Sequence, residues 1–265
     1  MKSYRILYFI IFISFNSYSQ KLFKEYGERE YSDTLNIELL HKICDNSELE
    51  FSDIYVNKSN SVSFQSDTTF FAIQYILKNT EDGNLYTTKY LLAKNSNGKV
   101  LAQLDDSDSY YDKEAVQPSP SYILKNPIKL STQNIGIGVI TEESVRSCAT
   151  IYSKQKISIF TLTNNKLNRV LENYPIRESH GESNCAGNYE IEILHKSVER
   201  MKSKTHGLFD LFITKKFTYE KVIEKNEDDS IEGKNIKKDK YETEKLLFDG
   251  EKYKFKEDNV LRFLK

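Results

Sequence analysis

Strand-length runs of apolar and β-branched residues, separated by short turns, constrain this chain more than any other feature. Three such runs follow one another in residues 68–79, 85–94 and 99–104, and the turns between them contain Asp82-Gly83 and Asn97-Gly98. Turn residues of this kind join neighbouring antiparallel strands. This part of the chain therefore predicts a β-meander.

A second series of strand-like segments fills the remaining sequence, at residues 135–141, 156–163, 166–173, 189–194, 207–217 and 240–255. Long helical segments are missing between them, which argues against βαβ units and a doubly wound sheet. Gly136-x-Gly138 lacks the third glycine and the following helix of a dinucleotide site, so close packing of a strand explains the pair better. We expect a mainly β fold, either an antiparallel meander or partial β-propeller-like sheets.

One short amphipathic helix is expected near the start of this β-rich region. Asp33-Thr34 suits a helix N-cap, and the apolar residues after it recur at helical spacing. They are Leu35, Leu39, Leu40, Ile43 and Cys44.

The N-terminus carries the pattern of an export signal. Lys2 and Arg5 precede an apolar run over residues 6–13, and the small residues of Ser17-Tyr18-Ser19 stand before Gln20. A charged start, a short apolar core and small residues at a cleavage point are typical of secretory signals. We therefore expect residues 1–19 to be a signal peptide, residues 20–265 to form a single β-rich domain, and the protein to be periplasmic or secreted, as in Gram-negative bacteria.

The charge of the exported chain bears on its partners. Loss of residues 1–19 removes Lys2 and Arg5, so 38 Lys and Arg become 36 against 39 Asp and Glu, and the net charge changes from −1 to −3. This balance does not favour nucleic acid or an anionic membrane. The apolar core of the signal is too short to persist as an anchor. We expect no nucleic-acid partner and no transmembrane anchor after cleavage.

Three cysteines in an exported chain predict one disulfide and one free thiol. Cys148 and Cys185 both lie in polar, Gly- and Ser-containing sequence, whereas Cys44 falls on the apolar side of the expected helix. A buried free thiol is common at such a helical position. The favoured pair is therefore Cys148 with Cys185.

Two polar segments interrupt the β pattern, at residues 105–119 and 225–240. Both are charged and poor in aliphatic residues, so they are expected to be solvated and mobile, and the first is a candidate sub-boundary of the domain. Its acidic residues lack the glycine and glutamate of a calcium loop. Tyr110 and Tyr111, flanked by acids, are candidates for a protein-binding patch because tyrosine favours interfaces.

The segment Glu178–Gly187, ESHGESNCAG, combines residue types that serve hydrolases. His180, Glu182 and Ser183 stand close together in sequence, but a Gly-x-Ser-x-Gly elbow is missing. Paired His and Cys ligand spacing for zinc is missing as well. We expect a polar loop fixed by Cys185, in which His180 and Glu182 are candidates for binding, and we assign no catalytic residue, metal site or cofactor.

Two short motifs near the C-terminus resemble the repeat unit of exported bacterial proteins of the FG-GAP/VCBS group. One is a strand opening with glycine, an aromatic residue, aspartate and leucine, and the other is an aromatic-Asp-Gly-x-x-Tyr turn. The positions are Gly207, Phe209, Asp210, Leu211, Phe248, Asp249, Gly250 and Tyr253. The Asp-x-Asp-Gly calcium consensus of that group is absent. The resemblance implies propeller-like blades and a binding or scaffold role.

These observations favour an exported, non-enzymatic protein that binds another protein or an envelope component. Two alternatives remain open. One is a small periplasmic hydrolase that uses residues 178–187, which requires His180 to meet a carboxylate and a serine. The other is an inhibitor or immunity-type protein that blocks a partner enzyme with the disulfide-fixed loop.

Overall fold

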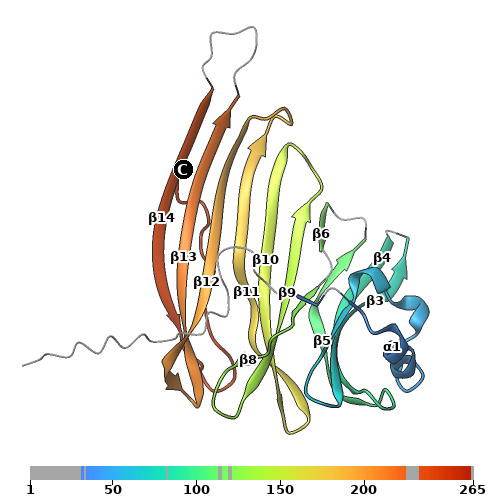
Figure 1. The fold of residues 1–265 in the computed structure, drawn as a ribbon. Coiled ribbons are helices and arrows are strands. Elements are labelled where there is room, and N and C mark those ends of the chain that lie inside the picture. Colours follow the sequence, from blue (N-terminus) through green and yellow to red (C-terminus); the bar gives the residue numbers. More distant parts are fainter. Residues whose placement is uncertain are drawn as a thin grey trace, which may run out of the picture.

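The computed structural model describes residues 31–263, except 33, 82, 113–114, 119–120 and 225–232. The predicted signal peptide, residues 1–19, lies outside the described residues. What is described is mainly antiparallel β-structure with a single α-helix, which confirms the predicted fold class (Figure 1). Two 3₁₀ helices, Phe51–Asp53 and Val56–Lys58, lie between the α-helix and the second strand.

Among the described residues, a large sheet contains ten strands, and its strands from β9 to β14 follow the order of the chain. The path runs β1-β7-β9-β10-β11-β12-β13-β14, with β6 and β8 also paired to β9. Every neighbouring pair is antiparallel. The meander is thus the alternative that the chain adopts. The strands are Tyr31–Ser32 (β1), Val116–Pro118 (β6), Tyr122–Leu124 (β7), Ile128–Lys129 (β8), Ile135–Val145 (β9), Thr150–Thr163 (β10), Lys166–Ser183 (β11), Tyr189–Thr205 (β12), Leu208–Ile223 (β13) and Lys234–Leu246 (β14).

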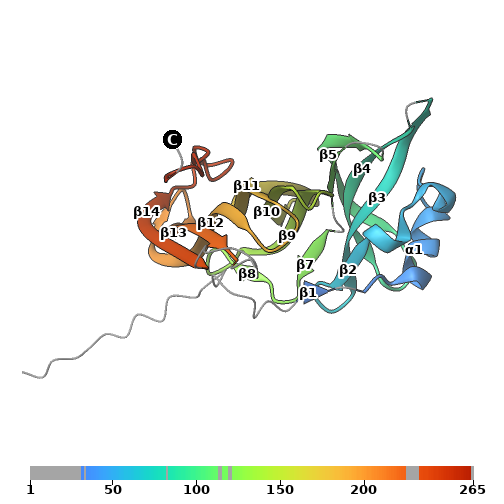
Figure 2. The ribbon, with the colours of Figure 1, turned by 90° about the horizontal axis from the view of Figure 1, so that it is seen from above.

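A second sheet of four strands lies between the large sheet and the helix α1 (Ile37–Cys44), as Figure 2 shows. It contains β2 (Asn60–Ser63), β3 (Thr68–Thr80), β4 (Gly83–Lys94) and β5 (Val100–Tyr111). Phe70 of β3 packs in a cluster with Phe160 of the large sheet, whereas Phe71 packs with Leu40 of α1. The nearly continuous apolar run of β3 follows from this position, because both of its faces are buried.

The helix begins two residues later than the sequence suggested. Its N-cap is Asn36, whose side-chain oxygen accepts a hydrogen bond from the Leu39 amide at 3.0 Å. The prediction of Asp33-Thr34 as the cap was wrong, because Asn36 supplies the same kind of acceptor. Cys44 ends the helix as a free, partly buried thiol, as expected.

Several strands extend well beyond their apolar runs. The sequence placed a strand end at Asn173, but β11 continues to Ser183 past an irregularity where Asn173 adopts φ of 47°. The Asn173 amide donates to Ser158 Oγ there, so the bulge is closed by a side chain. Polar residues continue in β11 because backbone pairing with β10 and β12 does not require apolar side chains.

Both segments expected to be solvated loops are strands over much of their length. Residues 105–111 belong to β5, and residues 234–240 belong to β14, while 225–232 lie outside the described residues. Within the described part of the chain, β5 pairs only with β4, and β14 pairs only with β13. Charged residues are well suited to such sheet edges, so low hydrophobicity did not indicate a loop.

After β14 the chain turns back and lies along one side of β12–β14 (Figure 2). We call residues 248–263 the C-terminal segment. The Tyr253 amide donates to the Val170 carbonyl at 2.7 Å, and the Tyr253 hydroxyl donates to the Phe209 carbonyl at 2.7 Å. The segment thereby connects β11 with β13 and completes the largest apolar core.

Candidate functional site

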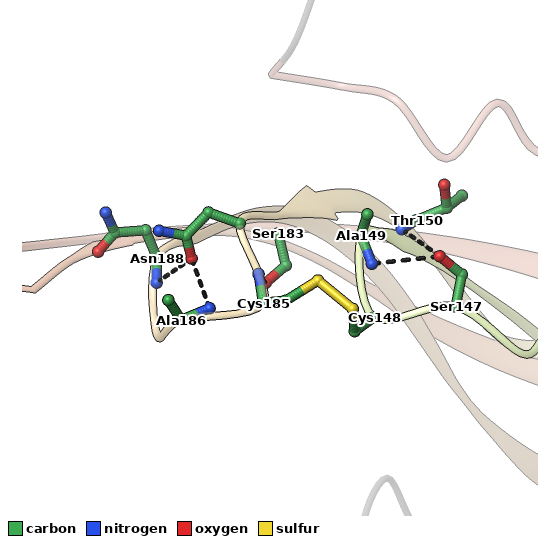
Figure 3. The surroundings of a disulfide bond; sticks show 9 residues. Ser147, Cys148, Ala149, Thr150, Ser183, Cys185, Ala186 and Asn188 are labelled. Carbon is green, nitrogen blue, oxygen red and sulfur yellow. Dashed lines mark hydrogen bonds between the residues drawn. A yellow bond between two sulfur atoms is a disulfide. The ribbon is translucent and has the colours of Figure 1, made fainter.

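A disulfide joins two turns at one end of the large sheet, which confirms the predicted pairing (Figure 3). Cys148 lies in the turn between β9 and β10, and Cys185 lies in the turn between β11 and β12. Their Cα atoms are 5.3 Å apart. β10 and β11 pair directly, and Thr150 with Glu182 is their last residue pair. The bond therefore links the turn before β10 to the turn after β11, next to this pair.

Short polar side chains shape both turns. Ser147 Oγ accepts from the Ala149 and Thr150 amides, and Asn184 Oδ1 accepts from the Ala186 and Asn188 amides (Figure 3). Asn188 Oδ1 in turn accepts from the Glu224 amide at 2.6 Å, just beyond β13. Such side-chain acceptors stabilise turns by replacing backbone partners. The disulfide and these hydrogen bonds consequently connect the turn after β9, the turn after β11 and the end of β13.

The loop expected at residues 178–187 is much shorter than predicted. Glu178–Ser183 forms the end of β11, and only the following residues turn into β12. His180 and Glu182 therefore lie on a strand and not in a loop, because Glu178–Ser183 pairs on one side with β10 and on the other with β12. The side chain of His180 is partly exposed, and Glu182 is exposed.

Four side chains gather around His180, and with it we call them the His180 cluster: Glu143, Tyr152, Lys154, Glu178 and His180. Glu143, Lys154 and Glu178 are successive cross-strand partners on β9, β10 and β11, and Tyr152 is the partner of His180. Directly opposite side chains of an antiparallel pair point to the same face. The cluster therefore forms two adjacent rows on one face of the sheet.

Hydrogen bonds and ion pairs connect the cluster. His180 Nε2 lies 2.7 Å from Glu178 Oε1, and Lys154 Nζ lies 3.3 Å from Glu178 Oε2. The Tyr152 hydroxyl donates to Glu143 at 2.9 Å, and its ring meets the His180 ring edge-on with centroids 5.2 Å apart. Each member thus has a neighbour that fixes its orientation.

Two members of the cluster have shifted pKa values. Burial, reinforced by the hydrogen bond to Glu143, raises the pKa of Tyr152, so its hydroxyl stays protonated as a donor. Burial disfavours the charge of Lys154, but Glu178 and Glu257 outweigh it and raise the pKa of that ammonium group. Tyr152 and Lys154 thus stay protonated between the acidic side chains of the cluster.

The serines near His180 do not form a catalytic arrangement with it. Ser179 is buried, its hydroxyl lies 2.8 Å from that of Ser153, and it points to the opposite face of β11 because neighbouring strand residues alternate. Ser183 Oγ accepts from the Cys185 amide at 3.0 Å. Cys185 is a disulfide partner and so is not a free thiol nucleophile.

Tyr110 and Tyr111 lie at the end of the strand β5 and not in a loop. Tyr110 pairs with Tyr86 of β4, and their rings are 6.1 Å apart. Burial first, and then the nearby Asp108 and Glu143 carboxylates, raise the pKa of Tyr110. Tyr111 pairs with Leu85 and is partly exposed.

Tyr110 and two members of the His180 cluster line the same narrow cleft between the two sheets. Tyr110 stands on one side, and Glu143 and Lys154 stand on the other. The volume of the cleft is about 20 Å³, and a single water requires roughly 10–15 Å³ measured in this way. The structure thus brings Tyr110 close to the cluster, leaves Tyr111 outside the cleft lining, and leaves room there for about one water molecule.

A buried charged group beneath the C-terminal segment could not be identified from the sequence. Asp258 lies 2.9 Å from Lys196 Nζ and 2.7 Å from Lys215 Nζ, and Glu244 also pairs with Lys215 at 2.7 Å. The Lys196 side chain is fully buried. Burial lowers the pKa of Lys196, whereas the two lysines outweigh burial and lower the pKa of Asp258.

The carboxylate of Glu192 binds the end of the C-terminal segment through hydrogen bonds. It accepts hydrogen bonds from the Arg262 amide at 2.6 Å and from the Phe263 amide at 3.1 Å. Glu192 is the cross-strand partner of His180, so the segment ends beside the His180 cluster. In the sequence, Glu192 looks like one more outward residue of an alternating strand, and only the returning chain reveals its role.

The described residues contain no group of three or more His, Cys, Asp or Glu side chains that could hold a metal ion. Among them, no helix is both long and apolar enough to cross a membrane. Comparison of the chain with protein-family models, with curated proteins and with solved structures found no match. The resemblance to FG-GAP/VCBS repeats consequently stays a prediction.

Proposed function

We propose that this is an exported, non-enzymatic β-rich protein that binds a protein or an envelope component. The surface we assign to binding is the disulfide-tied end of the large sheet, with His180 and Glu182 facing the partner. The single observation that carries this proposal is the His180 cluster, in which partly exposed charged groups are held in fixed orientations on paired strands. Sites on strands lose little order on binding, which favours affinity.

The volume of the cleft beside the cluster also supports binding through the surface and not inside a cavity. The cleft beside the cluster holds about 20 Å³, far less than the roughly 300–1,000 Å³ typical of small-molecule sites. A cleft of about 610 Å³ lies at the opposite end, near His206 and Lys252, and one of about 580 Å³ lies beside α1. Neither contains a residue of the His180 cluster.

The alternating charges on this surface provide specificity for a partner with complementary charges. Lys154 lies between Glu178 and Glu257, and Glu182 extends the row of acids toward the disulfide. Arrays of paired charges favour a complementary surface and penalise wrong partners through like-charge contacts. An inhibitor or immunity-type protein would use the same surface, and the two proposals differ only in the identity of the partner.

Export is tested first, by expression of the full chain in a Gram-negative host and mass spectrometry of the periplasmic protein. We expect a mature chain that begins at Gln20. A cytoplasmic protein that keeps residues 1–19 would contradict the export proposal.

Binding is then tested with a photo-crosslinking amino acid at Glu182, compared with the same group at exposed Lys129 on β8. We expect a specific adduct from Glu182 alone, which a His180→Gln substitution weakens while the melting temperature stays unchanged. Equal labelling from both positions would contradict the assignment of the surface. A hydrolase would instead show turnover of ester or peptide substrates that His180→Gln abolishes.

A further inference from the structure

The strand β14 forms a long outer edge of the large sheet (Figure 1). It spans 13 residues and, among the described residues, pairs only with β13. Unpaired backbone groups along an outer strand are a template for another strand. Lysines on an edge strand usually protect it from pairing with another strand. The strand β14 carries lysines, but on one of its faces they lie only in the first half.

Charge changes sign along one face of β14. Lys238 and Lys240 occupy this face in the first half, and Glu242 and Glu244 occupy it in the second half. On the opposite face, between the two halves, Tyr241 is 60% exposed and is one of the most exposed large apolar residues described. A strand with this order is complementary to an antiparallel copy of itself.

We propose that β14 pairs edge to edge with β14 of a second copy of this chain, in the antiparallel register centred on Tyr241. In that register, Lys240 lies opposite Glu242 of the copy, and Lys238 lies opposite Glu244 of the copy. The two-fold axis repeats both contacts, so four pairs of opposite charge form on one face. On the other face, each Tyr241 meets its equivalent.

Neighbouring symmetric registers are less favourable. Shifting the centre to Lys240 places two lysines opposite each other, and shifting it to Glu242 places two glutamates opposite each other. Like charges directly opposite in a sheet are destabilising, and aromatic pairs are stabilising. The charge pattern therefore selects one register, in which the four attractive pairs outnumber two repulsive pairings of Lys237 with Lys245.

The contacts that these residues already make are compatible with pairing. Lys240 and Glu242 of one chain are 3.0 Å apart, so with the copy they form a ring of four alternating charges. Lys238 lies over the Tyr219 ring at 5.6 Å, and Glu244 pairs with Lys215 at the base of the strand. Glu242 and Glu244 are both partly exposed. Lys238, Lys240 and Tyr241 are exposed and so are accessible to a second copy.

Charge reversal tests the proposal with the full mature chain in analytical ultracentrifugation at low salt. Lys240→Glu places glutamates opposite each other in the homodimer, and Glu242→Lys places lysines opposite each other. Each variant should raise the dimer Kd about tenfold or more. An equimolar mixture should regain wild-type affinity, because both cross-strand pairs again join opposite charges.

Controls separate edge pairing from other association. Lys129→Glu, a charge reversal on β8, should leave the Kd unchanged. In a Cys44→Ala background, Tyr241→Cys should form an intermolecular disulfide, because the residue is opposite its own copy. A wild-type chain that stays monomeric at all concentrations, or a mixture of the two charge variants that fails to associate, would overturn the proposal.

Discussion

Removal of the Cys148–Cys185 disulfide should destabilise the protein mainly through its unfolded state. The bond spans 37 residues, and the chain-entropy relation for a loop of this length gives an entropy of about 13 cal/mol/K, or about 4 kcal/mol at 25 °C. The native turns should keep their positions in a Cys148→Ala/Cys185→Ala variant. The Ser183 amide still donates to the Ala149 carbonyl at 2.8 Å, and the strand pairs on both sides remain.

Urea unfolding followed by circular dichroism measures this effect, with the slope and the midpoint fitted separately. We expect the double variant to lose about 4 kcal/mol of unfolding free energy, and its melting temperature to fall by on the order of 10 °C. Cys44→Ala is the control because Cys44 is a free thiol, and it should retain the bond and its contribution. A double variant within about 1 kcal/mol of the wild type would refute the chain-entropy reasoning.

Three further predictions concern Asp258 and Gly181. Asp258→Ala should cost about 3–5 kcal/mol because it leaves the ammonium group of Lys196 buried without its carboxylate; a loss below 1 kcal/mol in urea unfolding would show that the pair is dispensable. Acid should destabilise the wild type more than Asp258→Asn: since the pKa of Asp258 is lowered on folding, its contribution is complete above the ordinary value of about 3.9 and is lost as pH falls through the folded-state pKa. Parallel acid titrations of unfolding free energy that coincide would contradict this. Gly181→Ala should cost about 1–3 kcal/mol, because the new Cβ would lie 2.8 Å from Ile191 Cα and closer still to the Glu190 carbonyl; thermal melts measure it against Glu182→Ala, which should differ little from the wild type.

Short-range chemistry made parts of this fold predictable. The Asn97-Gly98 turn joins β4 to β5, and Gly98 adopts φ of 72°, which glycine accepts without strain. Gly136 and Gly138 lie in β9 where a side chain would collide with Ile159 and Leu124, so the close approach inferred from the glycine pair is confirmed. Each of these features depends on a residue and its immediate neighbours.

The strand limits were harder to predict because pairing, and not hydrophobicity, decides them. β11 passes through Asn173 and into Glu178–Ser183, since β10 and β12 offer backbone partners along its length. For the same reason, His180 lies on a strand, although the sequence predicted a loop there. The amino-acid pattern does not reveal which polar residues have a neighbouring strand.

By itself, the sequence determined the antiparallel β-class, the short helix and the Cys148–Cys185 bond, because apolar alternation, turn residues and cysteine environment are local signals. Only the tertiary structure decided that Lys196 is buried beside Asp258, that Glu192 holds the C-terminal segment, and that Tyr110 stands across a cleft from Lys154. These contacts join residues distant along the chain. Their partners are set by how the sheets curve and how the chain returns across them, which no local pattern encodes.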